Sequence, residues 1–222
     1  MHTHRFDTFL RFLIRWEGAT NPIGREDTES IYLRATPFAF SKHPKDPGGA
    51  TMMGITMRVF TVWRTAICKQ PRPTETDLRS MPYAEWENIV RYLYWQPLRA
   101  DTLPFDCFNI ALADWHFHSG ATAIRHAQTL LGTEPDGYVG RKTINAAKRA
   151  MPTRERARLL ATQLTETRRA WLQALALRQP QLATFAQGWD NRINALLFLF
   201  QTLDLTEEEE RAHRRTAAAQ KA

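Results

Sequence analysis

The chain has 222 residues, of which 43% are hydrophobic and 24% charged, a composition typical of a soluble globular protein with a core of its own. Its formal net charge of +7 favours an anionic partner, such as nucleic acid, a membrane surface or a bacterial cell wall. Nucleic acid is the weakest of these, because the sequence has no basic run interleaved with aromatic residues and no zinc-finger spacing.

Membrane and metal signals are weak in this sequence. The longest apolar run, residues 195–200, is far too short to span a bilayer. No apolar signal-peptide core opens the sequence, so we expect a protein made in the cytoplasm. Cys68 and Cys107 lack metal-ligand spacing, and we expect neither a metal nor a cofactor.

The first predicted element is a helix that ends at Gly18, which we expect to adopt the left-handed conformation that closes many helices. Its apolar face carries Phe6, Phe9, Leu10 and Leu13. Glu17 continues that face, which is unusual because glutamate is rarely buried without a partner. Burial would keep the carboxyl protonated at neutral pH, as general-acid catalysis requires. The alternative is a structural salt bridge at the helix end.

A long aperiodic segment follows, over residues 19–49. Proline and glycine turn signals occur throughout it, and an aperiodic segment of this length inside a domain is typically functional or disordered. Short strands are expected around residues 31–33 and 54–57.

The rest of the chain is predicted to be helical. Apolar periodicity and proline or glycine breakers predict helices near 57–68, 80–96, 106–119, 124–131, 140–148, 152–179 and 189–200. Residues 205–222 carry an acidic run followed by basic and alanine residues, typical of a frayed, solvated end. The fold class is therefore mainly α, with a long irregular loop and a short β-hairpin near the N-terminus.

Three segments carry the candidate chemistry. The first is Trp-Glu-Gly around Glu17. In the second, Asp-Pro-Gly-Gly-Ala-Thr, consecutive glycines allow close approach of the backbone, while Asp46 and Thr51 supply a carboxylate and a hydroxyl. The third, Tyr-Trp-Gln-Pro, offers Trp95 and Gln96 as an aromatic platform and an amide, a combination that binds sugars. Together they suit glycoside hydrolysis, in which one group protonates the leaving oxygen and another positions water or stabilises positive charge.

Structural alternatives stand beside these interpretations. Asp-Pro-Gly-Gly is an ordinary turn sequence, and a tryptophan before a proline is more often core than platform. Asp114 and His118, one helical turn apart, either bind a metal or form a hydrogen-bonded core pair, and the second is the more common. A Ser/His/Asp triad lacks its Gly-x-Ser-x-Gly signature here.

Taken in order, the motifs resemble those of the N-acetylmuramidases of glycoside hydrolase family 108. The order is Trp-Glu-Gly, Asp-Pro-Gly-Gly-x-Thr, Gly-Ile-Thr and Tyr-Trp-x-Pro-Leu-Arg. Residues 130–143, Leu-Leu-Gly-Thr-Glu-Pro-Asp-Gly-Tyr-Val-Gly-Arg-Lys-Thr, are similar to the peptidoglycan-binding segment that follows this module in the family. The resemblance covers residues 5–200, and the motifs are moderately specific singly but strongly so in this order.

The resemblance implies a lysozyme-like, mainly α fold that cleaves the β-1,4 bond after N-acetylmuramic acid in peptidoglycan. Glu17 matches the family's proton donor, and Asp46 and Thr51 match its Asp-Pro-Gly-Gly-x-Thr motif. Asp114 begins an Asp-x-x-x-Asn-x-Gly pattern in which His118 replaces the asparagine. The candidates for substrate contact are Trp95, Gln96, Asp114 and His118.

The sequence also departs from the family pattern. The usual Glu-Gly-Gly is Glu-Gly-Ala here, with Ala19 in third place, and Tyr-Trp-Gln-Pro replaces Tyr-Trp-Asp-Pro. An insertion within residues 20–42 precedes the Asp-Pro-Gly-Gly turn. It lengthens a lip of the cleft, adds a substrate contact or displaces Asp46.

We therefore expect a muramidase, either a phage-type endolysin or a lysozyme used in secretion, in which Asp46, with Thr51, assists Glu17. The predicted organisation is a catalytic lobe over residues 1–100, a peptidoglycan-binding lobe over 101–204 packed on it, and a charged tail over 205–222. A monomer is expected to act in the periplasm or cell wall, with a holin-type membrane protein as release partner. The alternatives are a lytic transglycosylase, a non-catalytic wall-binding or secretion accessory, and, more weakly, a DNA-associated helical protein.

Overall fold

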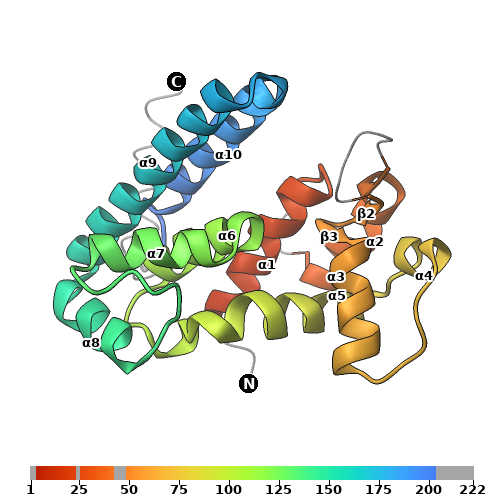
Figure 1. Cartoon of the computed structure of the whole chain (residues 1–222), viewed down its shortest axis with the longest axis horizontal. Coiled ribbons are helices and arrows are strands. Elements are labelled where there is room, and N and C mark those ends of the chain that lie inside the picture. Colours follow the sequence, from red (N-terminus) through yellow and green to blue (C-terminus); the bar gives the residue numbers. More distant parts are fainter. Residues whose placement is uncertain (1–3, 24–25, 43–48, 204–222) are drawn as a thin grey trace. The chain divides into compact units, whose positions relative to one another are not determined.

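Helices make up most of the chain, as the sequence predicts, and one small antiparallel sheet lies in its N-terminal part (Figure 1). The computed structural model describes residues 4–23, 26–42 and 49–203. The chain divides into two units, Met1–Gln96 and Pro97–Ala222. The frayed tail predicted over 205–222 lies outside the described residues. None of the described helices combines the length and the apolar character needed to cross a bilayer.

The N-terminal unit contains the sheet and the first helices. In chain order its elements are α1 (His4–Glu17), α2 (Thr28–Ala39), β1 (Phe40–Ser41), β2 (Thr51–Met52), β3 (Ile55–Thr56), α3 (Met57–Val62), a π-helical turn (Trp63–Ile67), α4 (Glu75–Arg79), α5 (Tyr83–Val90) and a second π-helical turn (Arg91–Trp95). The helix predicted over 57–68 is thus confirmed as α3 and the π-helical turn that continues it.

The remaining elements are helical. They are two 3₁₀ turns (Gln96–Leu98 and Ala100–Thr102), α6 (Asp106–Ser119), α7 (Ala121–Leu130), α8 (Arg141–Ala150), α9 (Arg154–Arg178), a 3₁₀ helix (Pro180–Phe185) and α10 (Ala186–Leu199). Every helix predicted in this part of the chain is confirmed. Threonine hydroxyls accept hydrogen bonds at the first turns of several helices, as Thr56 does for α3 and Thr153 for α9.

Residues 31–33, predicted as a strand, instead lie in α2. Asp27 caps this helix by accepting a hydrogen bond from the Ser30 N–H at 2.9 Å. Ile31, Tyr32 and Ala35 follow helical spacing and are fully buried. The prediction was wrong because prolines and glycines on both sides obscured a short helix whose stability comes from tertiary burial.

Pro37 explains why α2 was hard to recognise. It lies inside the helix, and it has no N–H to donate to the carbonyl of Leu33 one turn earlier. The Thr36 hydroxyl donates to that carbonyl instead, at 2.8 Å. The carbonyl therefore keeps a partner, and α2 continues past the proline to Ala39.

The sheet is a short meander in the order β1-β2-β3. Met52 pairs with Ile55 across β2 and β3, so the connection is a two-residue turn formed by Met53 and Gly54. Both have positive φ, 47° and 75°, as a type I′ hairpin turn requires. The strand predicted near residues 54–57 is confirmed as β3.

A buried ion cluster organises the C-terminal unit. Asp114 of α6 has no exposed surface, and its carboxylate accepts hydrogen bonds from Arg168 of α9 at 2.6 Å and from Arg192 of α10 at 2.6–3.2 Å. Burial opposes ionisation, but the positive charges of Arg192 and Arg168 outweigh it and lower the pKa of Asp114. One carboxylate thus joins α6 to α9 and α10.

We expect Asp114→Ala to lower the free energy of unfolding by about 3–5 kcal/mol, because two buried arginines lose their counter-charge. Glu166→Ala, which removes a partly exposed partner of Arg169, should cost at most about 1 kcal/mol. Because the pKa of Asp114 is lower in the folded state, its contribution should be complete above pH ~4 and lost as pH falls further. Urea unfolding over a range of pH measures both variants, and equal losses would contradict the structural role of the cluster.

Candidate functional site

The end of α1, which carries the Trp-Glu-Gly motif, meets α2 and the β2–β3 turn at Gly18. A methyl group on this glycine would lie 2.6 Å from the Cβ of Ala35 in α2 and 3.1 Å from the sulfur of Met53 in the β2–β3 turn. These distances leave no room for a side chain at Gly18. Glu17, at the end of α1, is therefore held beside the hairpin that begins at Thr51.

The left-handed residue that closes α1 is Ala19, with φ 49°, and the expectation that Gly18 takes this conformation was wrong. The Thr20 N–H donates to the Arg15 carbonyl at 3.3 Å, the closing bond of a Schellman-type end. An alanine pays a steric cost here that a glycine avoids. This cost gives a physical reason for the second glycine of the family's Glu-Gly-Gly pattern, which Ala19 replaces.

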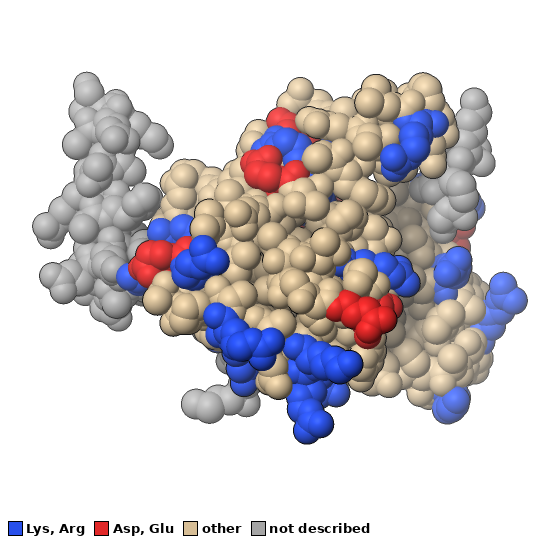
Figure 2. All heavy atoms as spheres, turned by 60° about the vertical axis from the view of Figure 1, so that its left-hand side comes forward, with Lys and Arg blue, Asp and Glu red and all other residues tan. Residues whose placement is uncertain are grey.

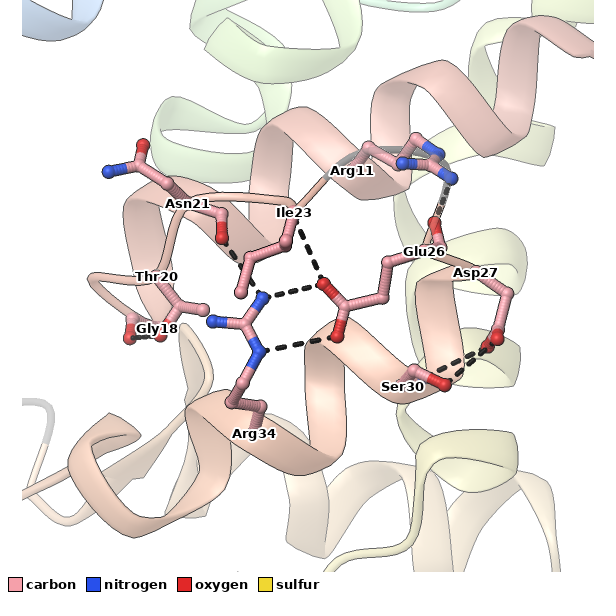
Figure 3. Close-up of polar contacts among 9 residues, drawn as sticks. All are labelled: Arg11, Gly18, Thr20, Asn21, Ile23, Glu26, Asp27, Ser30 and Arg34. Carbon is pink, nitrogen blue, oxygen red and sulfur yellow. Dashed lines mark hydrogen bonds and ion pairs between the residues drawn. The ribbon is translucent and has the colours of Figure 1, made fainter.

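The segment before α2 is braced by a network of polar contacts (Figure 3). Arg34 of α2 donates two hydrogen bonds to the Glu26 carboxylate, at 2.6 and 3.2 Å, and one to the Asn21 carbonyl at 3.0 Å. These bonds from Arg34 lower the pKa of Glu26. Arg11 of α1 donates to the Glu26 carbonyl. The part of the predicted insertion around Glu26 is thus hydrogen-bonded to α1.

Met53 connects the hairpin to its surroundings. Its N–H donates to the Ala39 carbonyl at the end of α2, at 3.3 Å, and its carbonyl accepts a bond from the Trp86 indole at 3.0 Å. The residue has no exposed surface, so burial and these bonds offset the cost of its positive φ. The hairpin that carries Thr51 therefore has a fixed position on α2 and α5.

Tyr94 is the member of the third motif whose ionisation is influenced by Glu17. The pKa of Tyr94 is raised to about 12, mainly by burial and to a smaller extent by the negative charge of Glu17. A charge influences a phenol in this way only at short range. Tyr94 was not among the predicted site residues, although it directly precedes Trp95.

Trp95 lies in the core of the N-terminal unit. It has no exposed surface, and its ring stacks on Phe9 with centroids 5.5 Å apart. It therefore has no free face for a sugar, and the core alternative describes its place. Trp95 faces the core because it lies in a π-helical turn, in which the Gln96 N–H donates to the Arg91 carbonyl five residues back. The extra residue per turn places Trp95, five residues after buried Val90, on the buried face.

The remaining N-terminal candidates occupy different environments. Gln96 is exposed, and Thr51 is half-buried in β2. Glu17 is also half-buried. Asp46 lies outside the described residues. The roles assigned to these four residues stay predictions.

Asp114 and His118 belong to the C-terminal unit. A carboxylate with no exposed surface and two arginine partners holds helices together and has no oxygen open to a ligand. His118 is exposed, and its Nδ1 lies 2.9 Å from the Asp114 backbone carbonyl, not from its carboxylate. The core alternative describes Asp114. Within the described residues, no three His, Cys, Asp or Glu side chains group as metal ligands would.

Comparisons with known proteins match both parts of the chain. Residues 11–120 match the model of the Glycosyl hydrolase 108 family, and residues 122–194 match that of a predicted peptidoglycan domain. A solved structure of SagA from Brucella abortus is 27% identical to this chain with a TM-score of 0.61. That match covers 80% of this chain and 97% of SagA. Among curated proteins, none matched.

Substitutions at two neighbouring positions, 18 and 19, are expected to change the stability of the fold in opposite directions. Gly18→Ala should lower the free energy of unfolding by about 1–3 kcal/mol, because the new methyl group overlaps Ala35. Ala19→Gly should raise it by up to about 1 kcal/mol, because glycine adopts positive φ without the steric cost. Chemical denaturation of both variants tests the pair, and a stabilised Gly18→Ala protein would contradict the close approach.

The proximity of Glu17 and Tyr94 can be tested by titration. Glu17→Gln removes a negative charge that opposes formation of tyrosinate, so the pKa of Tyr94 should fall from about 12. It should remain above about 10, the ordinary value, because burial is the larger cause. Carbon NMR of the tyrosine rings measures this pKa, with Tyr94→Phe to assign the signal. An unchanged titration would place the two groups too far apart to interact.

Proposed function

Because residues 11–120 belong to the glycosyl hydrolase 108 family and residues 122–194 form a peptidoglycan domain, we propose that this peptidoglycan hydrolase is an N-acetylmuramidase. Its substrate bond is the β-1,4 linkage between N-acetylmuramic acid and N-acetylglucosamine. Hydrolysis of that bond needs an acid for the leaving oxygen and a second group that manages water or positive charge.

The placement of Glu17 carries this proposal. Its half-buried carboxyl ends α1, beside the hairpin that carries Thr51 and within electrostatic reach of Tyr94. Tyr94 keeps its proton through neutral pH, because its pKa is about 12. The Glu17 carboxyl thus has a neutral phenol and a fixed hairpin as neighbours, which suits a group that must return to the same position in each cycle.

In the proposed mechanism, Glu17 protonates the glycosidic oxygen as the sugar–oxygen bond breaks. Asp46, with Thr51, positions the attacking water or stabilises the oxocarbenium-like transition state. Thr51 lies on β2 directly before Met52 and Met53, so the hydrogen bonds of Met53 to α2 and α5 also limit where the Thr51 hydroxyl can be.

The proposed setting follows from the substrate. Peptidoglycan lies outside the cytoplasmic membrane, so the enzyme acts in the periplasm or cell wall and its activity lyses the bacterium. A holin-type membrane protein is the proposed release partner, in a phage-type endolysin or a lysozyme used in secretion. The enzyme works as a monomer.

Glu17→Gln should keep the fold and lower the rate of digestion of purified peptidoglycan by about 10²–10⁴-fold, because the amide cannot donate the proton. Glu29→Gln, the same change at an exposed position of α2, should leave the rate unchanged. Release of soluble fragments measures the rates, and circular dichroism checks the fold.

Mass spectrometry of the fragments identifies the reaction. N-acetylmuramic acid with a reducing end is the expected product, whereas an anhydro-muramic end would identify a lytic transglycosylase. Near-normal digestion by Glu17→Gln would exclude Glu17 as the acid. Absence of soluble fragments from the unaltered protein would favour a non-catalytic wall-binding accessory.

A further inference from the structure

The loop before α8 is held rigid by one buried amide. Gln128 of α7 is 1% exposed, and its NH₂ group donates to Asp136, to the Tyr138 carbonyl and to Thr143, at 2.6–3.1 Å. Its amide oxygen accepts a bond from the Gly137 N–H at 2.8 Å. The two hydrogens of the NH₂ group are shared among three acceptors, and the amide thereby connects α7 to the loop and to the first turn of α8. The backbone of the loop at Tyr138 is therefore held in place.

Tyr138 is exposed although the backbone of its loop is held by hydrogen bonds. Its side chain is 62% exposed, and a methyl group on Gly140 would lie only 3.4 Å from its ring. The ring is thus supported on the backbone of Gly140 while much of its surface remains open to solvent. An exposed aromatic ring on a backbone held in this way offers an apolar face and a polar hydroxyl, as sugar-binding platforms do.

Positive charges lie along the helix that follows the tyrosine. Arg141, Lys142, Lys148 and Arg149 of α8 are exposed and take part in no ion pair within the residues that the structure describes. Figure 2 shows basic side chains gathered on the lower part of the face that it brings forward, the side on which α8 lies in Figure 1. Four cations on a ten-residue helix favour an anionic partner.

The same loop contains two acidic residues, Glu134 and Asp136. The hydrogen bonds from Gln128 and the Tyr138 N–H, followed by the charges of Lys142 and Arg125, lower the pKa of Asp136. Arg125 also lies against the loop, with its guanidinium carbon 3.2 Å from where a Gly137 Cβ would be. Five cations thus outnumber two carboxylates, and a positive field remains around the ring.

We propose that Tyr138 and the cations of Arg125 and α8 form the face on which the peptidoglycan domain holds a glycan strand. A sugar ring lies on Tyr138, and carboxylates of the peptide stems lie against the cations. A neutral polysaccharide would leave the cations unused, and a simple polyanion would leave the ring unused. Peptidoglycan supplies both groups at a spacing of one sugar. The identity of this polymer rests on the proposed function, but the binding face does not involve Glu17.

The test measures binding of the full chain to purified peptidoglycan sacculi, with Glu17→Gln in every protein so that digestion does not interfere. Tyr138→Ala should weaken binding about tenfold, the effect of one aromatic contact. Arg141→Gln/Lys142→Gln should weaken binding at low salt and reduce its salt dependence. The matched controls are Phe198→Ala, at an aromatic residue 66% exposed on α10, and Arg72→Gln/Arg178→Gln, at exposed arginines elsewhere.

A neutral oligomer of N-acetylglucosamine separates the two contacts. Its binding should weaken in Tyr138→Ala and remain unchanged in Arg141→Gln/Lys142→Gln. Unaltered binding of sacculi by both variants, or equal weakening by the controls, would overturn the proposal. The two proposals can fail separately. If binding depends on Tyr138 but the protein with native Glu17 releases no fragments from sacculi, the binding face is supported and the muramidase function is refuted.

Discussion

The close approach at Gly18 is the constraint on which the candidate site depends. There α1, α2 and the β2–β3 turn meet with no space for a side chain, as the 2.6 Å distance to Ala35 shows. The residue before this contact is Glu17, so the packing that fixes the glycine also fixes the backbone from which the Glu17 side chain extends. Met53 extends the constraint to α5 through its bond from Trp86. Packing and backbone contacts therefore determine where the proposed acid leaves the end of α1.

The boundary of the family match and the boundary between the two compact units fall at different places in the chain. The glycosyl hydrolase 108 match ends at residue 120, whereas the N-terminal unit ends at Gln96. The difference is α6, which belongs to the family match but packs against α7 and α9 in the C-terminal unit. Asp114 adds to that packing through Arg168 and Arg192. The glycosyl hydrolase match thus ends in a helix that packs against helices of the peptidoglycan match, and a change in the core of α6 should affect both.

The candidate residues of the site could be proposed from the sequence, and the misses in the structural predictions have physical causes. Glu17 stood out because it continues an apolar helical face, and Thr51 because it follows two glycines that allow close approach of the backbone. Tyr94 was missed in favour of Trp95, because a π-helical turn is a single extra residue that helical periodicity does not reveal. The helix at α2 was missed because its stability comes from burial of Tyr32 and Ala35 against other elements.

The sequence by itself determined the mainly helical class, the positions of most helices and the order of the candidate motifs. These depend on apolar spacing and turn residues within a few positions of one another. Only the tertiary structure decided that Ala19 takes the left-handed conformation and that Asp114 is bound by arginines 54 and 78 residues away. The reason is that such pairings depend on which faces meet in three dimensions, and local periodicity does not specify a partner distant in the chain.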